Sequence, residues 1–253
     1  MKVTLLGTGT SQGIPVITCH CEVCSSIDFR DKRLRTSALI EIDGKCIVID
    51  TGPDFRQQML TNRVERVDAV VFTHEHKDHT AGLDDVRSYN FRYNKDMPVY
   101  GRERVIEQLR QEFAYIFAAF KYPGIPRLKT FEITNQEFEV EGINITPIEV
   151  LHYKLPVFGF RINDFVYLTD ANYISDEEKE KCMNPKVLIL NALQNEPHIS
   201  HFTLQEAIEL AQELKAEKTY FTHISHKLGR HKDVEAKLPE NIHLGYDGLS
   251  IYL

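Results

Sequence analysis

A short histidine-rich segment constrains this chain more than any other feature, because it directly follows an apolar run. The run and the segment read Ala69-Val70-Val71-Phe72 and Thr73-His74-Glu75-His76-Lys77-Asp78-His79. An extended chain places alternate side chains on one face, so His74 and His76 can point together at one metal ion. Asp78 and His79 follow where a helical pattern begins, and they can address a second ion. We therefore predict a strand end that carries ligands for two metal ions.

Size and charge narrow the class of protein. The chain has 253 residues, 42% of them hydrophobic, which is enough for a substantial core. Its formal net charge of -7 argues against a broad basic face for nucleic acid, so we expect a small substrate. No apolar run approaches the length of a secretory signal or a membrane span. We therefore expect a cytoplasmic protein without a membrane partner.

The cysteines form a second cluster, Cys19-His20-Cys21-Glu22-Val23-Cys24, which suits reduced thiolate ligands better than a disulfide framework. Its three thiolates are one ligand short of a closed tetrahedral zinc site. His226 lies three residues after His223, and it is free to complete the set if His223 faces other metals. His20 is the alternative donor. We predict a structural zinc site whose ligands are Cys19, Cys21, Cys24 and His226.

Strand and helix patterns occur in both halves of the chain, with no linker between them. Strands are predicted at Lys2–Leu6, Val67–Phe72, Lys186–Leu190 and Lys218–Phe221, and a hairpin at Ser37–Asp50 about Asp43-Gly44. A mostly helical pattern spans Gly101–Phe120, and a β-rich stretch spans Arg127–Asp170. Thr203-Leu204-Gln205-Glu206 is a capping box that opens an amphipathic helix. We expect one α+β domain over residues 1–253, with sheets in the middle and helices outside.

Three further candidate ligands follow other apolar strands: His152, Asp170 and His223. Taken singly, each is more readily explained as a surface histidine or a turn aspartate. Together with the first segment they complete a set, in the order His74-x-His76-x-Asp78-His79, His152, Asp170, His223. This pattern resembles the ligand set of the metallo-β-lactamase superfamily.

The resemblance implies a four-layer αββα sandwich and a dinuclear site. One ion would be held by His74, His76 and His152. The other would be held by Asp78, His79 and His223, with Asp170 bridging the two. Asp50, in Ile49-Asp50-Thr51-Gly52, matches an early aspartate motif whose role is a hydrogen bond that orients a ligand imidazole; a turn cap is the alternative.

These ligands indicate the chemistry without naming the metal. Imidazoles and carboxylates suit zinc, manganese or iron. Two such ions can share a water and activate it, so the expected reaction is hydrolysis by a metal-bridging hydroxide.

The two clusters together resemble a narrower group. Cys-x-Cys-x-x-Cys near the start and His223-x-x-His226 near the end are similar to the phosphoribosyl cyclic phosphodiesterase (PhnP) subfamily, from the loop at Gly7 to Gly248. The resemblance implies a phosphodiesterase acting on a small cyclic ribose phosphate or nucleotide. It also implies a further histidine that donates a proton or contacts phosphate. His201 is the matching position and His198 the competitor, so Asp78 and His201 are the expected catalytic residues.

Two other readings remain open. A tRNA 3′-processing endonuclease shares the metal set and a catalytic histidine, but it usually carries a basic, glycine-rich arm that this sequence lacks. A non-hydrolytic carrier related to quinone-cofactor biosynthesis proteins shares the cysteine-rich loop, although a pure binder has no need of an open metal pair. Superfamily members often pair, so a homodimer is an open expectation.

Overall fold

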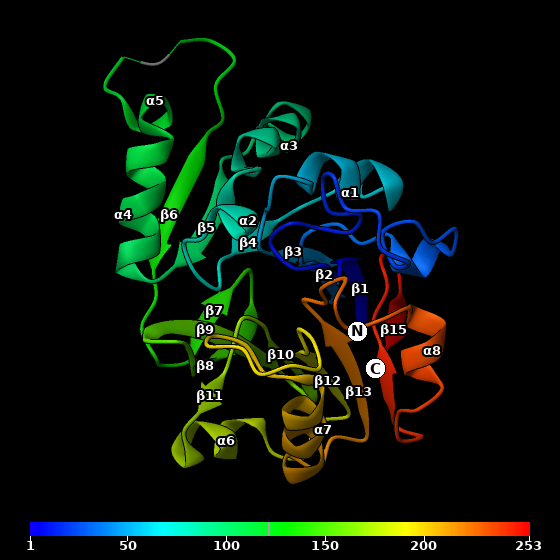
Figure 1. The fold of residues 1–253 in the computed structure, drawn as a ribbon. Coiled ribbons are helices and arrows are strands. Elements are labelled where there is room, and N and C mark those ends of the chain that lie inside the picture. Colours follow the sequence, from blue (N-terminus) through cyan, green and yellow to red (C-terminus); the bar gives the residue numbers. More distant parts are fainter. Residues whose placement is uncertain (121) are drawn as a thin grey trace.

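Two β-sheets pack face to face, and helices cover their outer faces (Figure 1). The computed structural model describes residues 1–120 and 122–253. These layers form the four-layer αββα sandwich predicted from the sequence (Figure 1), so the predicted fold class is confirmed. The two chain ends lie together, because the N-terminal amine of Met1 donates a hydrogen bond to Leu253 O over 3.1 Å.

The first sheet has seven strands in the order β15-β1-β2-β3-β4-β5-β6. Its strands are β1 (Lys2–Gly7), β2 (Ser37–Ile42), β3 (Lys45–Ile49), β4 (Ala69–Val71), β5 (Met97–Gly101), β6 (Leu128–Glu132) and β15 (Ser250–Tyr252). The pairs β15–β1, β1–β2 and β2–β3 are antiparallel, whereas β3–β4, β4–β5 and β5–β6 are parallel. The predicted hairpin between β2 and β3 is confirmed, with Asp43 and Gly44 at φ 48° and 72° in its turn.

The second sheet has the order β11-β8-β9-β10-β12-β13-β14, with β7 paired to β8. Its strands are β7 (Phe138–Val140), β8 (Ile143–His152), β9 (Leu155–Ile162), β10 (Phe165–Leu168), β11 (Tyr173–Ile174), β12 (Val187–Asn191), β13 (Lys218–Thr222) and β14 (Ile242–Leu244). Here β8, β9 and β10 are antiparallel and β10, β12, β13 and β14 are parallel. The predicted β-rich stretch after Arg127 is therefore confirmed.

Five helices of the described part of the chain lie on the side of the first sheet: α1 (Phe55–Thr61), α2 (Lys77–Thr80), α3 (Arg87–Tyr93), α4 (Glu103–Glu112) and α5 (Ala114–Phe117). The others are α6 (Asp176–Cys182), α7 (Leu204–Glu213) and α8 (His231–Glu235), with short 3-10 turns at Phe29–Asp31 and Leu83–Val86. The helical pattern over Gly101–Phe120 is broken in the structure. Gly101 ends β5, and Phe113 separates α4 from α5 with a non-helical backbone, φ -108° and ψ 39°. The capping box that opens α7 at Thr203 is confirmed.

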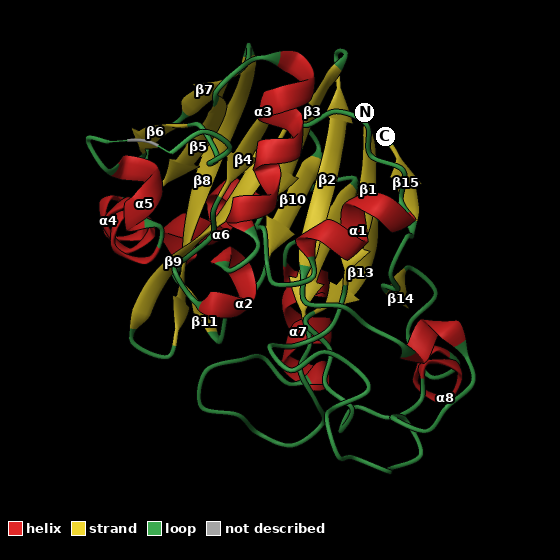
Figure 2. Cartoon of the chain, turned by 90° about the horizontal axis from the view of Figure 1, so that it is seen from above, coloured by secondary structure: helices red, strands yellow, loops and turns green. Residues whose placement is uncertain are grey.

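Apolar side chains fill three layers. Alternate residues of the two sheets, such as Ile40, Ile47, Phe158 and Tyr167, meet in the central layer. The opposite faces pack against α7 in the second sheet and against α1 and α4 in the first. Figure 2 shows long loops gathered beyond one end of the strands, on the side of α8. Within the described residues, no helix has the length and apolar character needed to cross a membrane.

Candidate metal centre

The candidate ligands come together because they leave their strands at the same edge of the sandwich. Asp50 follows β3, the histidine segment follows β4, and Asp170 and His223 follow β10 and β13. Asp50, Asp170 and His223 have φ of 62°, 54° and 54°, the left-handed region that Asp and His tolerate better than most side chains. These sharp exits turn the side chains back toward the edge, where strained backbone is typical of functional sites.

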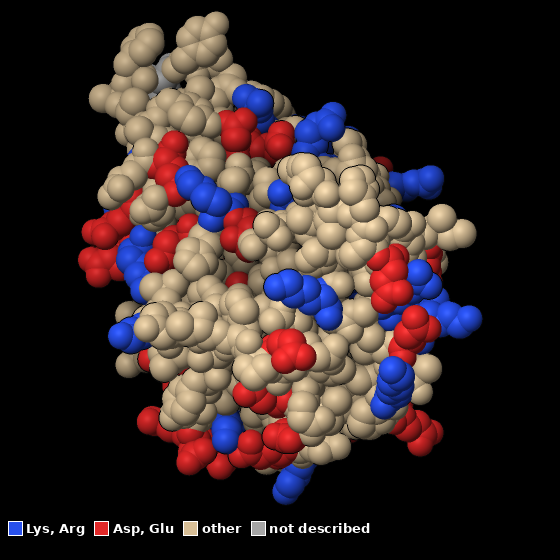
Figure 3. Space-filling view, viewed as in Figure 1, with Lys and Arg blue, Asp and Glu red and all other residues tan. Residues whose placement is uncertain are grey.

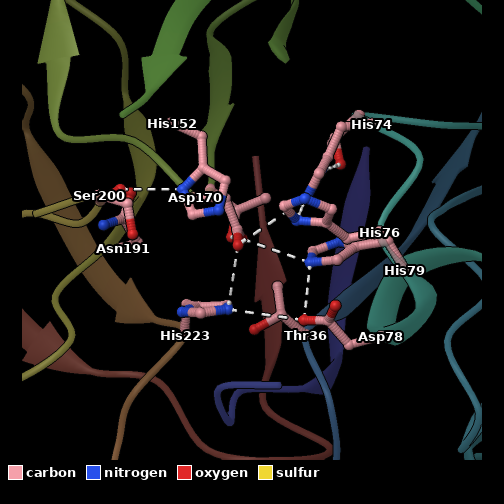
Figure 4. A network of polar contacts seen from close by, with 12 residues as sticks. Thr36, His74, His76, Asp78, His79, His152, Asp170, Asn191, Ser200 and His223 are labelled. Atoms are coloured by element: carbon pink, nitrogen blue, oxygen red, sulfur yellow. Dashed lines mark hydrogen bonds and ion pairs between the residues drawn. The ribbon is translucent and has the colours of Figure 1, made fainter. Parts of the chain in front are cut away.

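Two groups of predicted metal ligands result, each with its ligand atoms within 4.8 Å of one another. The groups are His74, His76, His152 and Asp78, His79, Asp170, His223, and a third group of His152, Asp170 and His201 overlaps both. Asp170 connects them: one carboxylate oxygen lies 3.4 Å from His79 Nε2, and the other lies 3.2 Å from His223 Nε2 and 4.0 Å from His74 Nε2 (Figure 4). This grouping agrees with the division of ligands that the resemblance implies, with Asp170 at the boundary.

Hydrogen bonds from outside the groups orient the imidazoles. Asp50 Oδ2 accepts from His79 Nδ1 over 2.7 Å, and Asp50 is itself held by the backbone N–H and the hydroxyl of Thr73. His152 Nδ1 donates to Ser200 O over 2.9 Å. Each bond fixes the Nδ1 side of a ring and leaves Nε2 directed at the cluster. Gly52 is required beside Asp50, because a Cβ there would collide with the backbone carbonyl of Asp78.

The charges of the cluster fit divalent cations. Burial alone would raise the pKa of Asp170, but the imidazoles of His223 and His79 hold it well below its usual range. Burial alone would lower the pKa of His79, yet Asp170, Asp78 and Asp50 raise it well above its usual value. A proton on His79 Nε2 and a metal ion bound there would each balance the negative charge of these carboxylates. Only one of them can occupy that nitrogen. Burial also lowers the pKa of His74, which favours the neutral form that binds metals.

An orphaned imidazole supports the same reading. His223 is 1% exposed, yet among the described residues its Nδ1 has no hydrogen-bond partner, and its Nε2 lies 3.2 Å from an Asp170 oxygen without hydrogen-bond geometry. Leaving buried polar atoms unpaired costs about 1–3 kcal/mol each, so natural proteins rarely do it without a ligand. The residues present therefore fit a pair of metal ions.

The structure places His201 inside the cluster and His198 at its rim. The His201 ring lies 4.6 Å, centroid to centroid, from both His152 and His223, and it is 7% exposed. His198 is exposed, and its ring lies 5.1 Å from that of His201. Burial lowers the pKa of His201 to about 2, so the ring is neutral and one N–H can donate a hydrogen bond.

Sequence reasoning missed Thr73 and Ser200. Thr73 stands in the opening segment, and its hydroxyl also contacts His74 Nδ1 over 2.9 Å, so its place before the first histidine was a usable signal. Ser200 acts through its backbone carbonyl, which carries no sequence signal.

The three clustered cysteines converge on one imidazole nitrogen. The Sγ atoms of Cys19, Cys21 and Cys24 lie 3.3, 3.5 and 3.5 Å from His226 Nδ1. The backbone N–H of Cys24 donates to Cys21 Sγ, and this bond lowers the pKa of the Cys21 thiol to about 6. A set of three sulfurs and one nitrogen, with a thiol already biased toward thiolate, fits a tetrahedral zinc ion. His20, the alternative donor, is not in this group.

The cysteine loop is tied to the strand exit that carries His223. Thr10 N–H donates to Ile224 O and Ile224 N–H donates to Thr8 O, so the start of the loop pairs with the residue after His223. Behind this contact Arg33, 3% exposed, donates to Thr8 Oγ1 and to Gly245 O. A zinc ion at His226 would therefore brace the same strand exit from a second side.

His231, which contacts Arg33, makes the stability of this region depend on pH. The buried ring accepts from Arg33 through Nδ1 over 3.1 Å, and burial, then Arg33 and Arg30, lower its pKa to about 4; Glu235 and Asp28 oppose the shift. A histidine whose folded-state pKa lies below its unfolded value binds fewer protons when folded. Its stabilisation is thus complete above the unfolded pKa of about 6.5 and is lost as pH falls toward 4.

We expect the wild-type protein to lose about 2–3 kcal/mol more unfolding free energy between pH 7.5 and 4.5 than His231→Asn does. Asparagine keeps an acceptor for Arg33 but cannot titrate, and metal release at low pH is common to both proteins. Urea unfolding at the two pH values measures the difference. Parallel losses in the two proteins would contradict the prediction.

Known proteins agree with this fold and site. A family model described as a beta-lactamase superfamily domain matches residues 45–224. A crystal structure described as a new diphosphatase from the PhnP family superposes with a TM-score of 0.93 at 39% identity, covering 100% of this chain and 97% of that one.

Two curated relatives bear other names. An octanoyltransferase of Porphyromonas gingivalis is 40% identical over 98% of this chain, which spans only 51% of that relative's length. The anti-Pycsar protein Apyc1 of Paenibacillus harenae is 25% identical, over 88% of this chain and 89% of its own. The matched family model and the full-length similarity to a PhnP-family structure together decide the family. The chain belongs to the metallo-β-lactamase superfamily and, within it, to the PhnP family of metal-dependent hydrolases.

Proposed function

We propose that this protein is a phosphodiesterase that hydrolyses a small cyclic ribose phosphate or nucleotide, with two divalent ions in its active site and one structural zinc. The observation that carries the proposal is the junction at Asp170, where both ligand groups meet beside the His201 ring. A phosphate group placed there would contact both groups and a neutral imidazole at once. The active-site ions are proposed to be zinc, manganese or iron, since imidazoles and carboxylates suit all three.

The chain's own groups have distinct parts in the reaction. When bound, two divalent ions lower the pKa of water to about 7 and neutralise charge that builds on phosphorus. His74, His76 and His152 would hold one ion, and Asp78, His79 and His223 the other, with Asp170 between them. Asp50 and Ser200 keep two of these rings in place. His201 would donate its N–H to the leaving oxygen, because no other described group occupies its Nδ1.

A phosphoanhydride is the second candidate substrate. The PhnP-family structure similar to this chain is described as a diphosphatase, and the same attack at phosphorus would cleave an anhydride. The name octanoyltransferase belongs to a protein about twice as long, and we do not carry that activity over. A tRNA substrate is disfavoured by the net charge of -7 and by the mixture of acidic and basic side chains on the face seen in Figure 3.

One panel of substrates tests the proposal. Metal-loaded protein is incubated with bis(4-nitrophenyl) phosphate, ribose cyclic phosphates, 2′,3′-cyclic nucleotides, nucleoside diphosphates and a precursor tRNA. A double variant, Asp78→Ala with His79→Ala, is the control for contaminating activity. Turnover of cyclic phosphodiesters above that control supports the proposal, whereas cleavage of diphosphates alone selects the second candidate. Absence of turnover on every phosphodiester refutes the leading proposal.

His201→Ala is expected to lower kcat by about 10²- to 10⁴-fold on an ester whose leaving group is a ribose hydroxyl. The loss should be far smaller with a 4-nitrophenolate leaving group, which is stable as an anion and needs no hydrogen-bond donor. His198→Ala, at the rim, is the matched control and should lose far less on both esters. Steady-state kinetics on the two substrates make the comparison. Equal losses on both would mean that His201 binds phosphate and does not serve the leaving oxygen.

A further inference from the structure

A two-residue turn stands beside the metal centre and carries two large exposed side chains. β8 ends at His152, which pairs with Leu155 of β9, so Tyr153 and Lys154 alone form the turn. The backbone N–H of Tyr153 donates to Asn172 Oδ1 over 2.7 Å, two residues beyond Asp170. The backbone of the turn is therefore fixed to the chain segments of two ligands, which places both side chains beside them.

The backbone of this turn favours a different residue from the one present. Tyr153 has φ 58°, and positive φ in two-residue hairpins is typical of Gly, Asn or Asp. A bulky aromatic residue is strained in this conformation. The strain brings no burial in return, because Tyr153 remains 48% exposed. Such a residue points to a role outside the fold itself.

The exposed ring lines a hollow that opens from the metal centre. The hollow measures about 470 Å³, and its walls are His76, His152, Tyr153, Lys154, Leu155, Ile199 and Ser200. Two candidate ligands, His76 and His152, thus share this hollow with the exposed side chains of Tyr153 and Ile199. Ile199 is 67% exposed, although it belongs to the loop that His152 holds through Ser200. The two apolar side chains are therefore carried by segments that are joined across His152.

The only charged side chain in the hollow other than histidine is Lys154. Its Nζ lies 5.3 Å from the centroid of the Tyr153 ring, and within residues 1–120 and 122–253 it has no ion-pair partner. An aromatic face, an aliphatic side chain and an ammonium group can together bind a nucleobase, because its ring stacks and its edge offers carbonyl and ring-nitrogen acceptors. A purely aliphatic chain would leave the ammonium unused, and a bare ribose phosphate would leave the apolar side chains uncovered.

We propose that this hollow is a nucleobase subsite, in which Tyr153 stacks on the base and Lys154 contacts its edge, so the substrate is a nucleotide and not a base-free ribose phosphate. The inference rests on the proposed function for the position of the phosphate. It adds the substrate class and the residues that select it.

A matched pair of substrates tests the subsite: adenosine 2′,3′-cyclic phosphate and methyl riboside 2′,3′-cyclic phosphate, which lacks the base. In metal-loaded full-length protein, Tyr153→Ala should lower kcat/KM about 10- to 100-fold for the adenosine ester, mainly through KM. It should leave the methyl riboside ester unchanged, and Tyr153→Phe should behave as wild type on both. Tyr173→Ala removes a similarly exposed tyrosine that does not line the hollow, and it should have no effect.

Two results would overturn the subsite: equal losses on both esters, which would mean that Tyr153 only supports His152, or no loss on either. If the wild-type protein hydrolyses neither ester, the proposed function fails but the subsite is still tested by binding. Calorimetry with adenosine 5′-monophosphate and ribose 5-phosphate then decides. The subsite is supported if Tyr153→Ala weakens the binding of adenosine 5′-monophosphate only. It is refuted if the variant weakens the binding of both ligands or of neither.

Discussion

Asp170→Asn is expected to lower kcat/KM by more than about 100-fold on any phosphoester that the wild-type protein hydrolyses. Groups that merely orient metal ligands are worth about 10- to 100-fold, whereas Asp170 lies beside His79 and His223 of one ligand group and 4.0 Å from His74 of the other. Asparagine has the same shape and tolerates the left-handed backbone at this position, φ 54°. Its neutral amide removes the charge that three imidazoles share, so metal content should fall as well.

The measurement combines kinetics with metal analysis of the same samples. Asp164→Asn is the matched control, because it removes a carboxylate from the exposed turn between β9 and β10 without touching the cluster. The variant should lose metal from the active site and retain the ion held by the cysteines. A variant with wild-type kcat/KM and a full complement of metal would show that Asp170 does not bridge the site.

The sequence predicted those parts of the fold that have strong local patterns. The Asp43-Gly44 turn and the capping box at Thr203 need only neighbouring residues, and both are present as predicted. β5 was not predicted, because Pro98 has no N–H for a neighbouring strand and argues against one. The break at Phe113 was also missed, since the apolar spacing continues through it although its backbone is not helical.

The site was predicted as far as ligand side chains are concerned. Spacing alone pairs His74 with His76, and the structure brings the distant His152 and Asp170 to them. The orienting carbonyl of Ser200 and the turn at Tyr153 follow from loop geometry, which residue types do not encode. The ligand roles themselves stay predictions until metal is measured, and the cysteine loop offers the clearest case.

Cys21→Ser is expected to lose one metal equivalent of about three per chain and to lower Tm by about 10 °C or more. A serine hydroxyl is a poor substitute for a thiolate, and the loss leaves Cys19, Cys24 and His226 without a shared ion. Their loop also pairs with Ile224, so its release should loosen the strand exit that positions His223. Metal analysis and thermal unfolding in the same buffer measure both effects.

Cys46→Ser is the matched control, because Cys46 is a half-buried thiol on β3, outside the cysteine group. It should keep both metal content and Tm near wild type. Activity measurements distinguish a structural role of the cysteine loop from a catalytic one. Well below its lowered Tm, Cys21→Ser should still hydrolyse substrate, since β13 and the contact with Asp170 continue to place His223. Inactivity at all temperatures would instead assign the cysteine loop a direct part in catalysis, and an unchanged metal count would remove the structural zinc altogether.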